Sequence, residues 1–87
     1  MEQKIMLAAH RGYSAAYPEN TMLAFREALK LDIDMIETDV HMTSDGVLVL
    51  MHDHVMERTT DMKGPIVNYT YAEVEKADAG SWKDPRF

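Results

Sequence analysis

Two acidic residues and a histidine lie near the middle of this 87-residue sequence, and their side chains could bind a metal and transfer protons. Glu37 and Asp39 are two positions apart, so on a β-strand both would point to the same face. Such a carboxylate pair suits a hard divalent cation, either Mg²⁺ or Ca²⁺, although water, substrate oxygens or a further ligand must complete its coordination. His52 is a candidate for general acid–base catalysis, because histidine side chains in general titrate near neutral pH.

A tight turn between these residues would bring their side chains together. The dipeptide Asp45-Gly46 favours the positive φ angles of a hairpin turn and is flanked by two β-prone runs. A two-residue loop would place Asp39 opposite His52 and Glu37 opposite His54, with Cβ atoms about 5 Å apart. A three-residue loop with a bulge would shift this register by one position.

A second group of polar residues, His10-Arg11-Gly12, follows an apolar run near the N-terminus. His10 is, with His52, one of the two imidazoles best placed for acid–base work. The forked guanidinium of Arg11 suits a phosphate or a carboxylate, and Gly12 lets the backbone turn sharply or approach a ligand. Together with the carboxylates, these residues predict a metal-assisted acid–base site that binds an anion, and cleavage of a phosphate ester would use all of these parts.

Two other histidines compete for these roles. His41 shares the strand face of Glu37 and Asp39 by parity, so spacing alone leaves it as an alternative metal ligand. His54 follows Asp53 in a loop, and we expect it to be solvated.

The elements that position these residues can be read from the apolar pattern. The run Lys4–Ala9 predicts a strand buried on both faces. An amphipathic helix is expected over Thr21–Leu31, with Asn20 as its N-cap and Phe25 in the core. Asp32 stands where a glycine would be expected after the helix.

The second half of the chain begins with two strand-like arms, Ile33–Met42 and Val47–His52. Because only a short turn joins them, they should pair antiparallel. Ile66–Asn68 is a candidate extended segment. Thr70 and Glu73 form a capping-box pattern for a short helix over Tyr71–Ala77, and the C-terminal residues read as loop.

Composition narrows the class of protein. The net charge of −6 argues against non-specific binding of nucleic acid, and the chain has no cysteine for a disulfide or a thiolate zinc site. The apolar run Ile5–Ala9 is too short for a signal peptide or a membrane span. We therefore expect one small domain in the cytoplasm.

Several short motifs, taken in order, resemble the glycerophosphodiester phosphodiesterase family. They are HRG (10–12), PENT (18–21), AF..A (24–28), D.IE.DV (34–40), T.DG (43–46), V..HD (49–53), RTT...G (58–64), Thr70 with Glu73, and DAG (78–80). The resemblance spans residues 7–80, and this number of motifs makes it far more specific than a single match.

The resemblance implies a TIM (β/α)8-barrel enzyme that hydrolyses glycerophosphodiesters to glycerol 3-phosphate and an alcohol, in phospholipid and glycerol metabolism. His10 and His52 would be the general base and acid, Arg11 would contact the phosphate, and Glu37 and Asp39 would bind the divalent metal. The route proposed for such enzymes has the glycerol 2-hydroxyl attack phosphorus, giving a cyclic phosphate that water opens.

A complete barrel of this type needs roughly 250 residues. Residues 1–87 are therefore expected to be the N-terminal portion of a single α/β barrel domain, truncated at its C-terminal end. It would hold only the first strands and helix, with a hairpin-like connection, and lack a further metal-binding glutamate. We expect the isolated chain to have little or no activity. The alternative is a non-catalytic remnant, or a metal- or phosphate-binding module that self-associates through exposed barrel edges.

Overall fold

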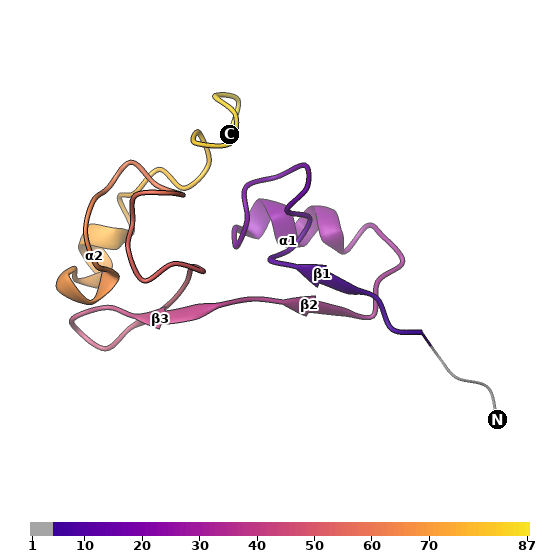
Figure 1. The fold of residues 1–87 in the computed structure, drawn as a ribbon, viewed down its shortest axis with the longest axis horizontal. Coiled ribbons are helices and arrows are strands. Elements are labelled where there is room, and N and C mark those ends of the chain that lie inside the picture. Colours follow the sequence, from indigo (N-terminus) through magenta and orange to yellow (C-terminus); the bar gives the residue numbers. More distant parts are fainter. Residues whose placement is uncertain (1–4) are drawn as a thin grey trace.

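The computed structural model describes residues 5–87, and the first residue of the expected N-terminal strand, Lys4, lies outside them. The elements in chain order are β1 (Ala8–His10), α1 (Met22–Ala28), β2 (Met35–Glu37), β3 (Val40–Met42), β4 (Leu48–Leu50), the 3₁₀ helix η1 (Ile66–Asn68) and α2 (Tyr71–Val74). They form an elongated molecule with principal extents of 50 × 30 × 17 Å. Figure 1 shows the β1–α1–β2 unit at one end and the hairpin with α2 at the other.

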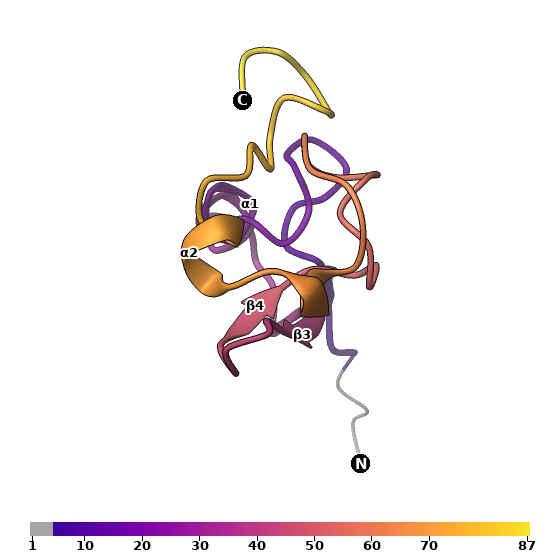
Figure 2. The ribbon, with the colours of Figure 1, turned by 90° about the vertical axis from the view of Figure 1, so that its left-hand side faces the viewer.

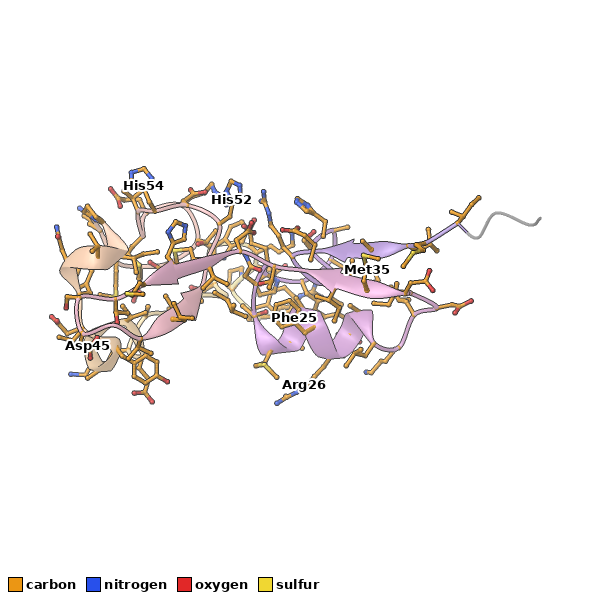
Figure 3. The ribbon with its side chains drawn as sticks, turned by 90° about the horizontal axis from the view of Figure 1, so that it is seen from below. Phe25, Arg26, Met35, Asp45, His52 and His54 are labelled. Carbon is orange, nitrogen blue, oxygen red and sulfur yellow. The ribbon has the colours of Figure 1, made fainter. Side chains whose placement is uncertain are left out.

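The first unit is a parallel strand pair connected by a helix. β1 and β2 pair in parallel, with Ala8 beside Met35 and His10 beside Glu37. Helix α1 buries Ala24 and Ala28 completely. Figure 3 shows Phe25 on the strand side of α1 and Arg26 pointing away from it. The amphipathic pattern thus correctly predicts a helix that packs on strands, as a crossover between parallel strands requires.

The start of α1 differs from the prediction by one residue. Thr21, not Asn20, is the N-cap: its backbone is extended, and its Oγ1 accepts a 3.2 Å hydrogen bond from the amide of Ala24. Thr21 Oγ1 also donates to the carbonyl of Pro18 at 2.7 Å. The cap rule fits both residues equally well by sequence, but Asn20 has a left-handed backbone with a φ of 56°. The Asn20 side chain does not cap the helix and can form hydrogen bonds with other residues.

The hairpin forms in the shifted register. Val40 pairs with Leu50 and Met42 with Leu48, and the turn has three residues, closed by hydrogen bonds between Thr43 and Val47. The expectation that Asp39 lies opposite His52 is therefore wrong, since the Met51 amide donates to the Asp39 carbonyl. The left-handed Gly46, with a φ of 82°, supplies the bulge that a three-residue loop requires.

The first arm of the hairpin is also not one continuous strand. β2 ends at Glu37 and β3 begins at Val40, so Thr38 and Asp39 lie between a parallel and an antiparallel pair. The expectation that Glu37 and Asp39 share a strand face therefore does not hold, because the strand breaks between them.

The second half packs around a small core of Met51, Met56 and Ile66. The capping box of Thr70 and Glu73 is present and begins α2, which is shorter than predicted. Residues 66–68 form a 3₁₀ turn rather than an extended segment. Figure 2 shows α2 beside the β3–β4 hairpin.

The strands are more exposed than the apolar runs suggest. Leu7 is 55% exposed, Met35 44% and Val40 50%, so the prediction of a strand buried on both faces is wrong for the chain as described. Within residues 5–87, no helix is long and apolar enough to cross a membrane.

Candidate active site

Four of the predicted site residues meet where β1 and β2 end. The parallel register places His10 beside Glu37, and His10 Nε2 lies 3.1 Å from Glu37 Oε2. Arg11 follows directly, and its backbone amide donates to the Glu37 carbonyl at 2.8 Å. Since parallel strands end at the same edge of a sheet, motifs far apart in the sequence meet here, as the family resemblance implies.

A sharp backbone turn after β1 sets the direction of the Arg11 side chain. Arg11 and Gly12 both have left-handed backbones, with φ angles of 59° and 80°. A Cβ at Gly12 would lie 2.8 Å from the carbonyl carbon of Ala24, so only glycine lets the turn pack this closely on α1. The predicted turn is confirmed, and what the backbone approaches in this structure is helix α1.

The Arg11 guanidinium lies between two carboxylates. Its Nη1 donates to Glu19 Oε2 at 3.2 Å, and its Nε is 3.6 Å from Asp39 Oδ2. The side chain is 19% exposed, so this positive charge is partly shielded from water. The guanidinium of Arg11 therefore places a fixed positive charge next to Asp39, one of the two candidate metal ligands.

Asn20 connects the loop after β1 to the break between β2 and β3. Its Nδ2 donates to Asp39 Oδ2 at 3.2 Å, and its Oδ1 accepts from Thr38 Oγ1 at 2.8 Å. The interpretation of Asn20 as a helix cap missed this role, because both contacts are far away in the sequence. The only sequence signal for it is the PENT motif.

Glu37 and Asp39 have the donor chemistry for a hard divalent cation. Among the described residues 5–87, Glu37 Oε2 is shielded from water and makes no hydrogen bond, although His10 Nε2 lies 3.1 Å away, and a divalent cation could bind this oxygen. In the same range, no cluster of three or more histidine, aspartate or glutamate side chains could enclose a metal. Glu37 and Asp39 as metal ligands therefore stay a prediction.

His52 lies on the loop that follows β4. Its ring Nδ1 is 2.8 Å from Asp53 Oδ1, and its backbone carbonyl accepts a hydrogen bond from His41 Nε2 at 3.0 Å. That bond occupies one ring nitrogen of His41, which counts against His41 as a metal ligand through Nε2. His52 is exposed, as is His54, and Figure 3 shows both on the side of the molecule away from Arg26.

A continuous line of ion pairs and hydrogen bonds joins His52 to Arg11. Arg58 donates to Asp53 through Nε at 3.0 Å and Nη2 at 3.1 Å, and to Glu19 through Nη1 and Nη2, both at 2.9 Å. Glu19 in turn accepts from Arg11. We call this line, Arg11–Glu19–Arg58–Asp53–His52, the Arg58 network.

Contacts within the Arg58 network alter the pKa values of Glu19, Asp53 and Arg58. Hydrogen bonds from Arg58 lower the pKa of Asp53, with His52 adding to the effect, and they lower the pKa of Glu19 against the opposing effect of burial. The bonds to Glu19 and Asp53 raise the pKa of Arg58. All three groups are thus held in their charged forms at neutral pH.

The prediction from sequence assigns roles to five residues and misses the groups between them. Glu19, Arg58 and Asp53 belong to motifs of the family resemblance, but nothing in their spacing shows that they meet. Glu19 and His52 line one small pocket, together with Asn20, Leu50, Met51, Thr59 and Ala79.

Comparison with known proteins identifies the family of this chain. Residues 10–87 match the model of the glycerophosphoryl diester phosphodiesterase family. A glycerophosphodiester phosphodiesterase of Bacillus altitudinis is 52% identical over 71 residues, which are 82% of this chain and 29% of the relative. One of Bacillus subtilis is 46% identical over 79 residues, 91% of this chain and 27% of the relative.

Solved structures show the same local fold. A glycerophosphodiester phosphodiesterase of Agrobacterium tumefaciens superposes with a TM-score of 0.93 and 40% identity, covering 97% of this chain and 36% of that one. A phosphodiesterase of Oleispira antarctica, solved in complex with the product sn-glycerol-3-phosphate, has a TM-score of 0.90 and 40% identity over 94% of this chain and 33% of its own. This chain spans about a third of the length of the relatives it matches, and it belongs to the glycerophosphoryl diester phosphodiesterase family.

Proposed function

We propose that this chain carries the catalytic histidines, the phosphate-binding arginine and two metal ligands of an enzyme that hydrolyses glycerophosphodiesters to glycerol 3-phosphate and an alcohol. The observation that supports this most is the meeting of His10, Arg11, Glu37 and Asp39 at the shared end of β1 and β2. These residues supply a proton-transfer group, a fixed cation and two hard oxygen ligands within one edge of a sheet.

The chemistry follows from what these groups can do. One of His10 and His52 takes the proton of the glycerol 2-hydroxyl as its oxygen bonds to phosphorus, while the other protonates the leaving alcohol oxygen as its bond to phosphorus breaks. With the two roles exchanged, water then opens the cyclic phosphate to glycerol 3-phosphate. Arg11 offsets the negative charge on the phosphoryl oxygens in both steps. A divalent cation held by Glu37 and Asp39 would polarise the same oxygens when bound.

The proposal includes the place of this chain in a larger domain. We propose that residues 1–87 form the N-terminal portion of a (β/α)8 barrel, with further ligands supplied by later strands. Two features support this: the relatives are about three times longer, and large apolar residues of the strands, such as Met35, Leu48 and Leu50, are exposed. In a closed barrel, such side chains would be covered by neighbouring elements.

Binding of the product tests the phosphate site directly. We expect glycerol 3-phosphate, added with Mg²⁺ or Ca²⁺, to shift the NMR signals of Arg11 and its neighbours, and Arg11→Gln to abolish the shifts. Arg26→Gln is the control, since Arg26 is exposed on α1 and has the same charge. Equal shifts in both variants would contradict the assignment of Arg11.

An activity assay tests the place of the chain in the larger domain. Incubated with glycerophosphocholine and Mg²⁺ or Ca²⁺, the 87-residue chain should release little or no glycerol 3-phosphate, because two carboxylates leave the coordination shell incomplete. Turnover comparable to that of a longer relative would show that no further ligand is needed.

A second function is favoured by one observation, the exposure of Met42, Leu48 and Leu50 on the hairpin. Such an edge could pair with a second copy, giving a non-catalytic module that binds metal or phosphate. Sedimentation would separate the two functions: a stable folded dimer without affinity for divalent metal would favour the module.

A further inference from the structure

We propose that Glu19 and Arg58 are positioning residues of this site, which hold the Asp53 carboxylate against the His52 ring and fix that ring relative to Arg11. The inference rests on the proposed function, since it concerns how the proposed acid–base histidine is oriented. The evidence for it is the set of contacts in the Arg58 network, which link loops that lie 39 residues apart in the sequence.

The first step concerns the proton on His52. An ionised carboxylate can only accept a hydrogen bond, so the 2.8 Å contact between His52 Nδ1 and Asp53 Oδ1 requires a proton on Nδ1. In the neutral ring, Nε2 then carries the lone pair and can accept a proton from a substrate hydroxyl. The His52 side chain is 46% exposed. Asp53 therefore selects the tautomer that a general base needs.

The second step concerns what keeps Asp53 in place. Arg58 binds Asp53 through Nε and Nη2 and Glu19 through Nη1 and Nη2, so a single planar guanidinium fixes two carboxylates. Only the forked geometry of arginine can make both bidentate contacts, because the lysine ammonium is a compact point charge. Without Arg58, Asp53 would be free to turn away from His52.

The third step concerns the fixed end of the line. The Glu19 side chain is only 9% exposed and lies between the guanidinium groups of Arg11 and Arg58. Glu19 follows Pro18, which is fully buried, and precedes Asn20. The backbone N–H of Asn20 donates to the Arg11 carbonyl at 2.9 Å. Glu19 thus sits on a well-held turn and connects the phosphate-binding arginine to the support of His52.

The backbone of His52 has a separate anchor. His41 Nε2 lies 3.0 Å from the His52 carbonyl, and since a carbonyl only accepts, the His41 proton must be on Nε2. His41 and His52 are therefore expected to be opposite tautomers, which gives an internal reference for measurement.

Long-range ¹H–¹⁵N NMR spectra of the imidazole rings test the proposal on the 87-residue chain, at a pH where the histidines are neutral. We expect His52 to be mainly the Nδ1–H tautomer and His41 the Nε2–H tautomer. Arg58→Lys should move His52 to a mixture of tautomers without changing His41, and Glu19→Gln should cause a smaller shift in the same direction. Arg86→Gln is the control, because Arg86 forms its ion pair with Asp84, outside the Arg58 network.

The outcomes separate this inference from the proposed function, since the readout needs no substrate and no turnover. A wild-type His52 that is mixed or Nε2–H overturns the inference, and so does an unchanged His52 in both folded variants. If both variants lose the signal dispersion of a folded chain, the Arg58 network is needed for folding and the positioning role is rejected. If the tautomers behave as expected while glycerol 3-phosphate fails to bind, only the proposed function falls.

Discussion

Asn20 and Asp39 are joined by a 3.2 Å hydrogen bond from the Asn20 amide nitrogen to Asp39 Oδ2, although they lie 19 residues apart. The same amide accepts from Thr38 Oγ1, so one side chain holds both residues of the break between β2 and β3. Asn20 has a φ of 56°, a backbone conformation that asparagine tolerates better than most residues. Asparagine therefore suits this position both by its backbone conformation and by its side-chain contacts.

Substitution of Asn20 separates these two contributions. Asn20→Gly keeps the left-handed backbone at little cost and loses only the amide bridge, whereas Asn20→Ala loses the bridge and pays for the backbone as well. We expect the free energy of unfolding of Asn20→Ala to be lower than that of Asn20→Gly by roughly 1 kcal/mol. Urea unfolding followed by circular dichroism measures the difference, and equal stability of the variants would contradict the strained backbone.

Gly12 and Gly46 form a matched pair for a second prediction. Their φ angles are nearly equal, 80° and 82°, but a Cβ at Gly46 would meet nothing within 4 Å while one at Gly12 would overlap Ala24. Gly46→Ala should therefore cost only the backbone strain, about 1–2 kcal/mol. Gly12→Ala should cost more, because it must also push α1 away from the loop after β1. Thermal unfolding compares them, and a Gly12→Ala no worse than Gly46→Ala would show that α1 can shift freely.

Metal binding should depend on both carboxylates at the break. We expect Glu37→Gln and Asp39→Asn each to abolish the NMR shifts that Mg²⁺ or Ca²⁺ induces near β2, because a hard cation prefers charged oxygen ligands. Asp32→Asn is the control, since Asp32 is exposed and its loss changes the net charge equally. Weakening by all three variants to the same extent would indicate a general charge effect rather than a site.

Stability should fall in acid through the carboxylates bound by Arg58. The pKa values of Asp53 and Glu19 are lowered in the folded chain, chiefly by hydrogen bonds from Arg58. Their contribution is therefore complete above the unfolded carboxyl pKa of about 4 and is lost as the pH falls through the lower folded values.

The variant Arg58→Gln should flatten this dependence. The free energy of unfolding of the wild-type chain should decrease as the pH is lowered from about 5 to about 2, and that of the variant should decrease less. Urea unfolding at a series of pH values gives both curves. Parallel curves would mean that Arg58 does not set these pKa values.

Local patterns predict the elements of this chain well and their long-range contacts less well. The turn at Asp45, the helix around Phe25 and the capping box at Thr70 are set by neighbours in the sequence, and the structure contains all three. The hairpin register differs, because two loop lengths fit the same dipeptide. The break at Thr38 could not be predicted, since it arises where two different pairing partners meet.

The candidate site shows the same division. The residue types of His10, Arg11, Glu37 and Asp39 indicate their chemistry, and the structure brings these four together. The supporting contacts of Glu19 and Arg58 could not be predicted, because they depend on how two distant loops pack and no periodicity records that.

The three-residue turn of the hairpin also belongs to the C-terminal half of the chain. The Ser44 amide donates to the Tyr69 carbonyl at 2.8 Å, and Asp45 Oδ1 accepts from the amide of Tyr71 at the start of α2. Exposed turns are the usual places to insert a tag or a cleavage site. Here such an insertion would detach α2 from the hairpin, so an engineer should treat this tip as a joint and place labels elsewhere.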